Sequence, residues 1–328
     1  MTELSMAAGP ANPVLAEVVR SGFTESVHRG SLVVLGQDGA PAMAAGAIDR
    51  PMFPRSSNKP MQAAGMLRAG LDLPDRLLAL ASASHSGEDF HVAGAREILA
   101  GAGLTEDDLQ CPPDLPLNSA ARAAMVRSGA QPDRIHMNCS GKHAGMLASC
   151  VAAGWPTASY RDPEHPLQRL IRQVVEDLAG EPVTAIGVDG CGAPLMALTP
   201  VGLARAFRAV VLAEPGSPER RVADAMRAHP LVMSGTGRSD AILMTAVPGL
   251  LMKGGAEGVC AFALPDGRAA AVKIDDGNAR AVPVVMAAVL RDLAADLPGT
   301  DLAVLDRLAA EPVLGAGQPV GEIRPVLG

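Results

Sequence analysis

Apolar residues follow different periods at the two ends of the chain and in its middle. The stretch SLVVLGQDGAPAMAAG, residues 31–46, places two apolar runs around the triplet QDG, which predicts two strands joined by a tight turn. Residues 249–277 contain three short apolar runs separated by glycine-rich breaks, which predicts three consecutive antiparallel strands. Composition and spacing between these ends predict helices over residues 61–70, 92–103, 118–130, 142–153, 166–179, 201–214, 218–228 and 279–296.

This order of elements predicts an α/β protein of the α+β kind. Helices should cover an antiparallel sheet in which the N- and C-terminal strands meet. Residues 111–118 are expected to form a connecting loop, and residues 183–192 a strand that ends in a glycine-rich turn. Residues 1–12 are expected to form a flexible N-terminal arm, and residues 13–328 a single domain with room for two lobes.

The composition excludes several classes of protein. A net charge of -7, a pI of about 5.5 and the lack of any basic run argue against nucleic acid or an acidic membrane as a partner. The sequence contains no apolar stretch of membrane-spanning length, and its first residues lack the order of a signal peptide. Five cysteines, an odd number, favour reduced thiols or a metal site over a disulfide framework. The expected location is therefore the cytoplasm.

Lysine is the scarcest charged residue in the chain. Of 28 lysines and arginines together, only Lys59, Lys142, Lys253 and Lys273 are lysines. Arginine keeps its proton near neutral pH, whereas a desolvated lysine can lose it and then act as a base or a ligand. Each of the four is therefore a candidate for a role that needs a neutral amine, and chance is the alternative explanation for any one of them.

The stretch RSSNKP, residues 55–60, combines one of these lysines with a serine. If a helix starts here, Ser56 and Lys59 lie three residues apart on one helical face. Pro60 fits the first turn of such a helix. Penicillin-binding proteins and serine β-lactamases use this S-x-x-K spacing, in which a neutral lysine can activate the serine. A serine N-cap followed by a surface lysine explains the same residues without chemistry.

Three further clusters gather polar residues at the expected ends of helices and strands. ASASHSGE (81–88) contains Ser84, which could equally belong to a serine-rich helix cap. NCSGKHAG (138–145) contains Cys139 and Lys142 but lacks the spacing of a phosphate-binding loop. VDGCGAP (188–194) contains Cys191. The two cysteines are far apart in the sequence, so they could also be inert core thiols.

Six motifs in order make the chain resemble a known family. RSSNKPMQ, ASHSGE, NCSGKHAGML, DGCGAP, GTGRSDAILM and KGGAEGV, with ESVHRG before them and VKIDDGN after them, resemble the Rhizobium-type (class 3) L-asparaginases, the asparaginase II family. The resemblance runs from about residue 14 to residue 328. It implies a fold like that of serine β-lactamases and penicillin-binding proteins, hydrolysis of L-asparagine to L-aspartate and ammonia, a bound zinc ion, and a homodimer.

The resemblance also implies roles for individual residues. Two serine–lysine pairs would be catalytic, namely Ser56 with Lys59 and Ser84 with Lys253. Zinc would be held by Cys139, Lys142 and Cys191, and the substrate by Arg55, His143 and Asp189. Lys273 has no such role and is expected to be structural. Asp240 stands about where some family members carry a cysteine, so its role is open.

The expected mechanism is acyl transfer from a side-chain amide. Lys59 would take the proton of Ser56, whose oxygen attacks the amide carbon, and Ser84 with Lys253 would carry protons to ammonia and from water. Zinc is expected to organise the site rather than to act as a Lewis acid. Two other functions fit parts of the pattern: a penicillin-binding or β-lactamase-like serine hydrolase, and a non-catalytic, zinc-stabilised amino-acid-binding protein.

Overall fold

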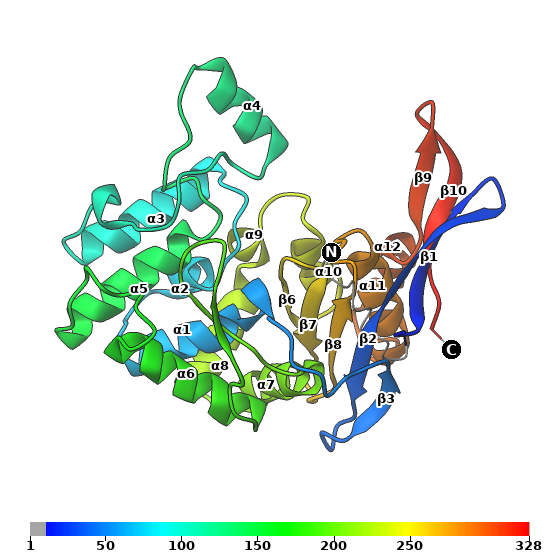
Figure 1. Ribbon diagram of the computed structural model, residues 1–328, viewed down its shortest axis with the longest axis horizontal. Coiled ribbons are helices and arrows are strands. Elements are labelled where there is room, and N and C mark those ends of the chain that lie inside the picture. Colours follow the sequence, from blue (N-terminus) through cyan, green and yellow to red (C-terminus); the bar gives the residue numbers. More distant parts are fainter. Residues whose placement is uncertain (1–10, 328) are drawn as a thin grey trace, which may run out of the picture.

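The computed structural model describes residues 11–327 and combines a large sheet with a group of helices. The sheet lies on one side of the molecule and most helices lie on the other (Figure 1). This arrangement confirms the predicted antiparallel sheet with helices covering it. Ten of the twelve residues of the predicted N-terminal arm, 1–10, lie outside the described residues, so the arm stays a prediction.

The main sheet has eight strands in the order β6-β7-β8-β2-β1-β10-β9, with β3 paired to β2 at one side. A separate two-stranded sheet is formed by β4 and β5. The strands are β1 (Val14–Arg20), β2 (Phe23–Leu35), β3 (Pro41–Ala45), β4 (Ile186–Val188), β5 (Pro194–Met196), β6 (Leu251–Gly254), β7 (Val259–Ala263), β8 (Ala269–Ile274), β9 (Glu311–Gly315) and β10 (Gln318–Pro325).

Strands from the two ends of the chain meet in this sheet, as the sequence predicts. Leu32 of β2 lies opposite Val272 of β8, and Val18 of β1 lies opposite Ile323 of β10, all in antiparallel register. The hairpin of β2 and β3 and the meander of β6, β7 and β8 also match the predicted strands. The early strand β1 and the late hairpin of β9 and β10 were not predicted.

Helices fill the rest of the chain. They are α1 (Lys59–Arg68), α2 (Asp75–Ala81), α3 (Asp89–Gly101), α4 (Ser119–Arg127), α5 (Ser140–Ala153), α6 (Pro166–Ala179), α7 (Pro200–Leu212), α8 (Pro218–Ala228), α9 (Pro230–Met233), α10 (Ser239–Ala246), α11 (Ala281–Leu293) and α12 (Leu302–Leu308), with 3-10 turns η1 (Arg55–Asn58) and η2 (Glu106–Asp108). Helices α7 and α11 both pack on β7 and β8, whose central residues are buried. None of the described helices is long and apolar enough to cross a membrane.

The predicted helix start at Ser56 is replaced by a tighter turn. Residues Arg55–Asn58 form η1, and the α-helix begins only at Lys59. Pro60 has no N–H to donate to the Ser56 carbonyl four residues earlier, so this carbonyl accepts the Lys59 N–H instead. Ser56 therefore sits in a 3-10 turn just before α1.

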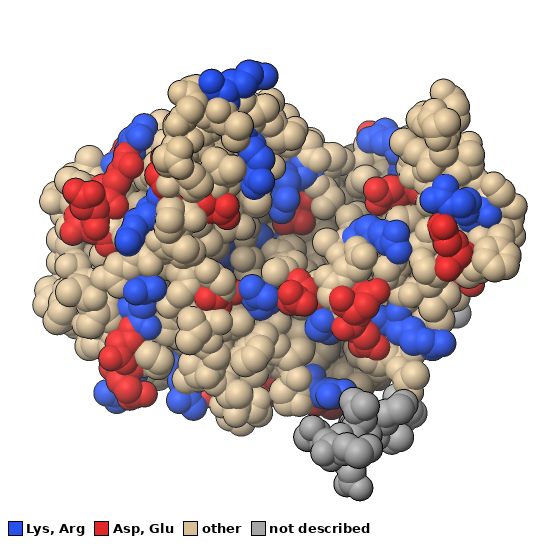
Figure 2. Space-filling view, turned by 45° about the horizontal axis from the view of Figure 1, so that its top comes forward, with Lys and Arg blue, Asp and Glu red and all other residues tan. Residues whose placement is uncertain are grey.

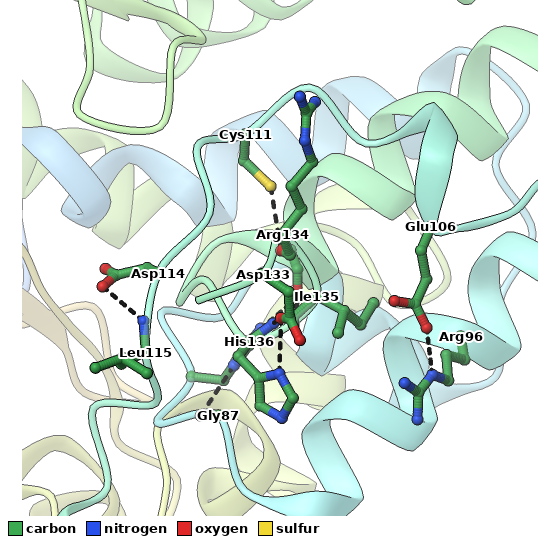
Figure 3. A network of polar contacts seen from close by, with 12 residues as sticks. Gly87, Arg96, Glu106, Cys111, Asp114, Leu115, Asp133, Arg134, Ile135 and His136 are labelled. Atoms are coloured by element: carbon green, nitrogen blue, oxygen red, sulfur yellow. Dashed lines mark hydrogen bonds and ion pairs between the residues drawn. The ribbon is translucent and has the colours of Figure 1, made fainter. Parts of the chain in front are cut away.

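Helix α4 stands away from the body of the protein, and none of its residues is buried (Figure 1). The chain enters and leaves this arm side by side, because Asp114 and Asp133 pair through their backbones. The Asp133 carboxylate also accepts the His136 backbone N–H and lies 2.7 Å from the ring Nδ1 (Figure 3). The arm thus has a fixed base. The incoming segment of this base places Asp114 at the wall of a cavity.

Candidate active site

A cavity of about 740 Å³ lies where the helices meet the sheet. The molecular surface is hollowed near the middle of one face, and both basic and acidic side chains surround the hollow (Figure 2). Seven residues that the sequence singled out line the cavity, and five of them come from η1, the loop after α2, the start of α5 and the turn after β4: Arg55, Ser56, Ser84, Cys139 and Asp189. Cys191 and Asp240 line it as well. The fold thus gathers motifs that are far apart in the sequence.

Turn η1 is locked against the end of β6, which fixes Ser56 at the cavity wall. The Ser57 hydroxyl donates to the Lys253 carbonyl at 2.9 Å. A Cβ atom at Gly255 would lie only 2.7 Å from the Pro54 carbonyl oxygen, so the backbones can approach this closely only because residue 255 is glycine. Ser56 is the more exposed of the two candidate catalytic serines, since Ser84 is buried.

The Lys59 side chain forms a hydrogen bond with Ser84 rather than with Ser56. Its buried ammonium donates to the Ser84 hydroxyl at 2.9 Å and lies 3.0 Å from the Cys139 sulfur, and it also donates to the Ala83 carbonyl. Within residues 11–327 no hydrogen bond joins the Ser56 side chain to that of Lys59, or the Ser84 side chain to that of Lys253. Sequence spacing suggested the pair Ser56–Lys59, whereas the geometry pairs Lys59 with Ser84 across two motifs.

Lys253 approaches the cavity from the sheet. It is buried, its ammonium donates to the Gly254 carbonyl at 2.7 Å, and it lies 3.8 Å from the Asp240 carboxylate. Burial lowers the pKa of Lys253 to about 8, although Asp240 acts in the opposite direction. A substantial fraction of this amine is therefore neutral in mildly alkaline solution, which a proton-exchanging group requires.

The three predicted zinc ligands lie together on the helical side of the cavity. Lys142 Nζ is 3.0 Å from the Cys191 sulfur, and the titrations of the Cys139 and Cys191 thiols depend on each other through a mutual interaction. That interaction raises the pKa of Cys139 and lowers the pKa of Cys191, so one of the two is readily a thiolate. Burial lowers the pKa of Lys142, but the two sulfurs outweigh burial and raise it.

The start of α5 comes this deep into the protein because two glycines let the helix pack closely. A Cβ atom at Gly141 would lie 2.6 Å from the Leu80 carbonyl oxygen, and one at Gly145 would lie 2.9 Å from Ala81 Cβ. Helix α5 therefore lies directly against α2, and its residues from Ser140 to Cys150 are all buried. This packing carries Cys139 and Lys142 to the inner end of the cavity.

The three predicted substrate-binding residues differ in their access to the cavity. Arg55 and Asp189 line it and form an ion pair at 2.8 Å, in which Arg55 has the left-handed backbone angle φ of +52°. His143 is fully buried, and its Nδ1 lies 2.6 Å from the Tyr160 hydroxyl. Burial lowers the pKa of His143 to about 4. Contact between His143 and a substrate stays a prediction.

The sequence matches the L-asparaginase II family over residues 16–325. The chain belongs to this family. It is therefore an amidohydrolase, and the resemblance read from the six motifs is confirmed. No curated protein matches the sequence.

Several solved structures resemble this family member in overall fold at low sequence identity. A β-lactamase from Mycobacterium bovis is 15% identical, with 81% of this chain and 95% of that chain covered and a TM-score of 0.47. A Bacillus glutaminase is 12% identical, with 82% and 92% covered and a TM-score of 0.46. Mglu in its native form in 4.3 M NaCl is 17% identical with a TM-score of 0.45, and this chain covers 61% of it with 81% of its own length.

Two arginines of the cavity were not predicted. Arg238 and Arg280 both line it. Arg280 is held in place because its Nε donates to His28 Nε2 at 2.9 Å, while His28 Nδ1 lies 2.7 Å from the Asp276 carboxylate. His28 belongs to the motif ESVHRG and Asp276 to VKIDDGN, so the two flanking motifs of the resemblance meet at this arginine. The presence of both motifs could have pointed to a contact between His28 and Asp276, but the distance between the motifs in the sequence could not.

Proposed function

We propose that this amidohydrolase is an L-asparaginase, which converts L-asparagine to L-aspartate and ammonia. The observation that carries the proposal is the meeting of two serines and a buried lysine at one cavity, in a chain of the L-asparaginase II family. Both serines line the cavity, and the Lys59 ammonium is bonded to the second of them. Such a set supplies a nucleophile and a proton carrier for attack on an amide.

The charges of the cavity suit a small zwitterion with a polar side chain. Arg55 and Asp189 present opposite charges side by side at the wall, and Arg238 adds a second cation. In our proposal the α-carboxylate of asparagine binds to an arginine and its α-ammonium to Asp189. The side-chain amide then points toward the serines. Charge-assisted hydrogen bonds of this kind fix orientation as well as affinity.

We assign the attack to Ser56 and the proton relay to Ser84. Ser56 is the more exposed of the two at the cavity wall. As its oxygen bonds to the amide carbon, its proton would pass through Ser84, whose hydroxyl is held by Lys59, to the amide nitrogen, and the C–N bond would break to release ammonia. Water then cleaves the ester, its proton returning through the same groups, while Lys253 supplies a second exchangeable proton from the sheet side. Atoms balance as amide plus water giving acid plus ammonia.

We further propose a zinc site at Cys139, Lys142 and Cys191. Among residues 11–327 no group of three or more His, Cys, Asp and Glu side chains is arranged for a metal, so the proposed site needs the Lys142 amine as its third ligand. The donor set fits, because two sulfurs and one amine converge away from solvent and Asp189 lies 3.7 Å from the Cys191 sulfur. Bound zinc would neutralise the thiolates and hold the start of α5 in place.

Ammonia release from asparagine and from glutamine, measured side by side with the purified protein, tests this function. We expect release from asparagine, with a much lower kcat/KM for glutamine. Hydrolysis of a chromogenic β-lactam without ammonia release from asparagine would favour the penicillin-binding or β-lactamase-like alternative. Binding of asparagine without turnover would favour a non-catalytic amino-acid-binding protein. We also propose a homodimer, which light scattering tests.

A further inference from the structure

Asp240 is a buried carboxylate at the cavity that the proposed mechanism does not use. It lies in the first turn of α10, lines the cavity, and is only 7% exposed. One carboxylate oxygen accepts the backbone N–H of Gly254 at 2.9 Å, and the same oxygen lies 3.8 Å from Lys253 Nζ. The carboxylate thus contacts both the backbone after Lys253 and the charge at the tip of its side chain.

Gly254 makes this contact possible. A Cβ atom at this position would lie 3.1 Å and 3.3 Å from the two carboxylate oxygens of Asp240. A side chain there would force the Asp240 carboxylate to shift by a few tenths of an ångström. Glycine and aspartate therefore form a matched pair, and the N-terminus of α10 favours the negative charge at the position that Asp240 occupies.

Among the described residues, Asp240 is the anion that balances Lys253. Besides burial, two cations lower the pKa of Lys253, Lys59 and Arg238, and two groups raise it, Asp240 and Cys260. Burial raises the pKa of the Cys260 thiol well above its usual value, so this thiol is uncharged near neutral pH. Asp240 is left as the charged partner.

We propose that Asp240 is a positioning residue for the amidase reaction, which anchors the end of β6 and keeps Lys253 in proton exchange near neutral pH. The inference rests on the proposed function only in that Lys253 exchanges a proton during turnover. The ion pair itself is a property of the folded protein. It can therefore be measured separately from activity.

Lysine scarcity allows a direct test. Lysine labelled with ¹³C at Cε gives one NMR signal from each of four side chains, and lysine-to-arginine variants assign them. Asp240→Asn keeps an oxygen that accepts the Gly254 N–H but removes the charge. We expect the pKa of Lys253 to fall by about one unit or more in this variant, because an opposite charge at this distance has that effect. Asp240→Ser, a second neutral variant, should give the same direction if the first folds poorly.

Activity against pH gives the second readout. A lower pKa of Lys253 moves the limb of the kcat/KM profile that depends on it to lower pH by the same amount, whether the amine acts as base or as acid. The matched control is Glu219→Gln, which alters a carboxylate of similar burial, 6% exposed, that is paired with Arg68 away from the cavity. The control should keep the wild-type Lys253 titration and the wild-type profile.

The outcomes separate the two proposals. A Lys253 pKa unchanged in folded Asp240→Asn and Asp240→Ser overturns the role of Asp240, whatever the activity is. A wild-type protein that releases no ammonia from asparagine or glutamine overturns the proposed function, while a lowered Lys253 pKa in both variants would still support the ion pair. A lowered Lys253 pKa with an unmoved kcat/KM profile would contradict the positioning role.

Discussion

The cavity has a helical wall, where Lys59 of α1 and Lys142 of α5 each contact a cysteine sulfur. It also has a sheet wall, where Lys253 of β6 contacts oxygen atoms. Lys59 and Lys142 each lie 3.0 Å from a cysteine sulfur. Lys253 instead contacts the Gly254 carbonyl and faces the Asp240 carboxylate. Cysteine thiolates are preferred ligands of zinc, whereas a single carboxylate beside a lysine chiefly balances the charge of the amine. Under the proposed function, the helical wall would combine metal binding with proton transfer, and the sheet wall would serve proton transfer alone.

Within the described part of the chain, the fourth lysine, Lys273, contacts neither a cysteine sulfur nor a carboxylate, unlike the three lysines of the two walls. Lys273 on β8 is half-buried and donates to the carbonyls of Glu257 and Ile274. Neither of these contacts is a sulfur or a carboxylate. Lys273 therefore serves as a control for the comparison of the two walls, because its contacts are ordinary structural ones.

The largest expected effect tests whether Ser56, in the turn η1 between the two walls, is the nucleophile. Ser56→Ala should lower kcat for asparagine by about 10³-fold or more, since removing a nucleophile leaves only binding and electrostatic stabilisation. Steady-state ammonia release measures this loss. The control Ser82→Ala removes a buried hydroxyl that donates to the Leu78 carbonyl and should keep most activity. Near wild-type kcat in folded Ser56→Ala would move the nucleophile to Ser84.

The second prediction asks whether both walls need an amine that can lose its proton. Lys59→Arg and Lys253→Arg should each lower kcat by about 10²-fold or more, because guanidinium keeps the charge but cannot exchange its proton near neutral pH. Lys273→Arg should be nearly silent. Ammonia release by the three variants under identical conditions checks this. Equal activities in all three would show that the contrast between cavity lysines and Lys273 has no catalytic meaning.

The third prediction concerns the sulfurs that distinguish the helical wall. Protein purified without chelator should contain about one zinc per chain, and Cys139→Ser and Cys191→Ser should lose it. Lys142→Arg should weaken zinc binding more than Lys142→Ala, since it removes the amine and leaves a positive charge beside the metal. Elemental analysis gives the zinc content.

Cys150→Ala is the matched control for the metal, because Cys150 is a buried thiol of the same helix α5 near its far end. It should retain zinc. A fully active wild-type protein with no bound metal would reject the zinc site, and the serine–lysine assignments would be unaffected by that result.

Much of the fold could be predicted because local signals agree with it. Helix α6 has the predicted bounds, 166–179, since Pro166 begins it and Gly180 ends it in a left-handed conformation. Strands β9 and β10 could not be predicted, because Pro312, Gly315 and Pro319 interrupt any regular alternation and the two strands bury few side chains.

The site was predictable in its membership but not in its pairing. Two motifs carry Ser56, Lys59 and Ser84, and the structure brings both motifs to one cavity. The bond from Lys59 to Ser84 depends on how α1 packs against the loop after α2, which sequence spacing does not specify. Similarly, Asp240 could be noticed in the sequence, but its contact with Gly254 and Lys253 required the folded chain.

The smallest expected effect concerns a neutral histidine behind the helical wall. His85 is fully buried beside Ser84, and its Nδ1 accepts the Gly87 N–H. The Ser140 hydroxyl donates to the Ile135 carbonyl, so His85 Nε2 must donate its proton to Ser140. Burial, then His91 and Lys59, lower the pKa of His85 well below its ordinary value of 6.5. The helical wall therefore keeps this ring uncharged next to the buried Lys59.

This lowered pKa makes stability fall as the solution is acidified. Below about pH 6.5 the unfolded chain binds a proton at His85 that the folded protein does not, so the free energy of unfolding decreases by up to about 1.4 kcal/mol per pH unit until the folded pKa is reached. His85→Gln keeps an N–H donor but cannot be protonated. Urea unfolding at several values between pH 7 and pH 5 should show a shallower decline for this variant, even if it is less stable at pH 7. Parallel declines in the two proteins would mean that His85 is already charged in the folded state, and the helical wall would then tolerate charge as the sheet wall does.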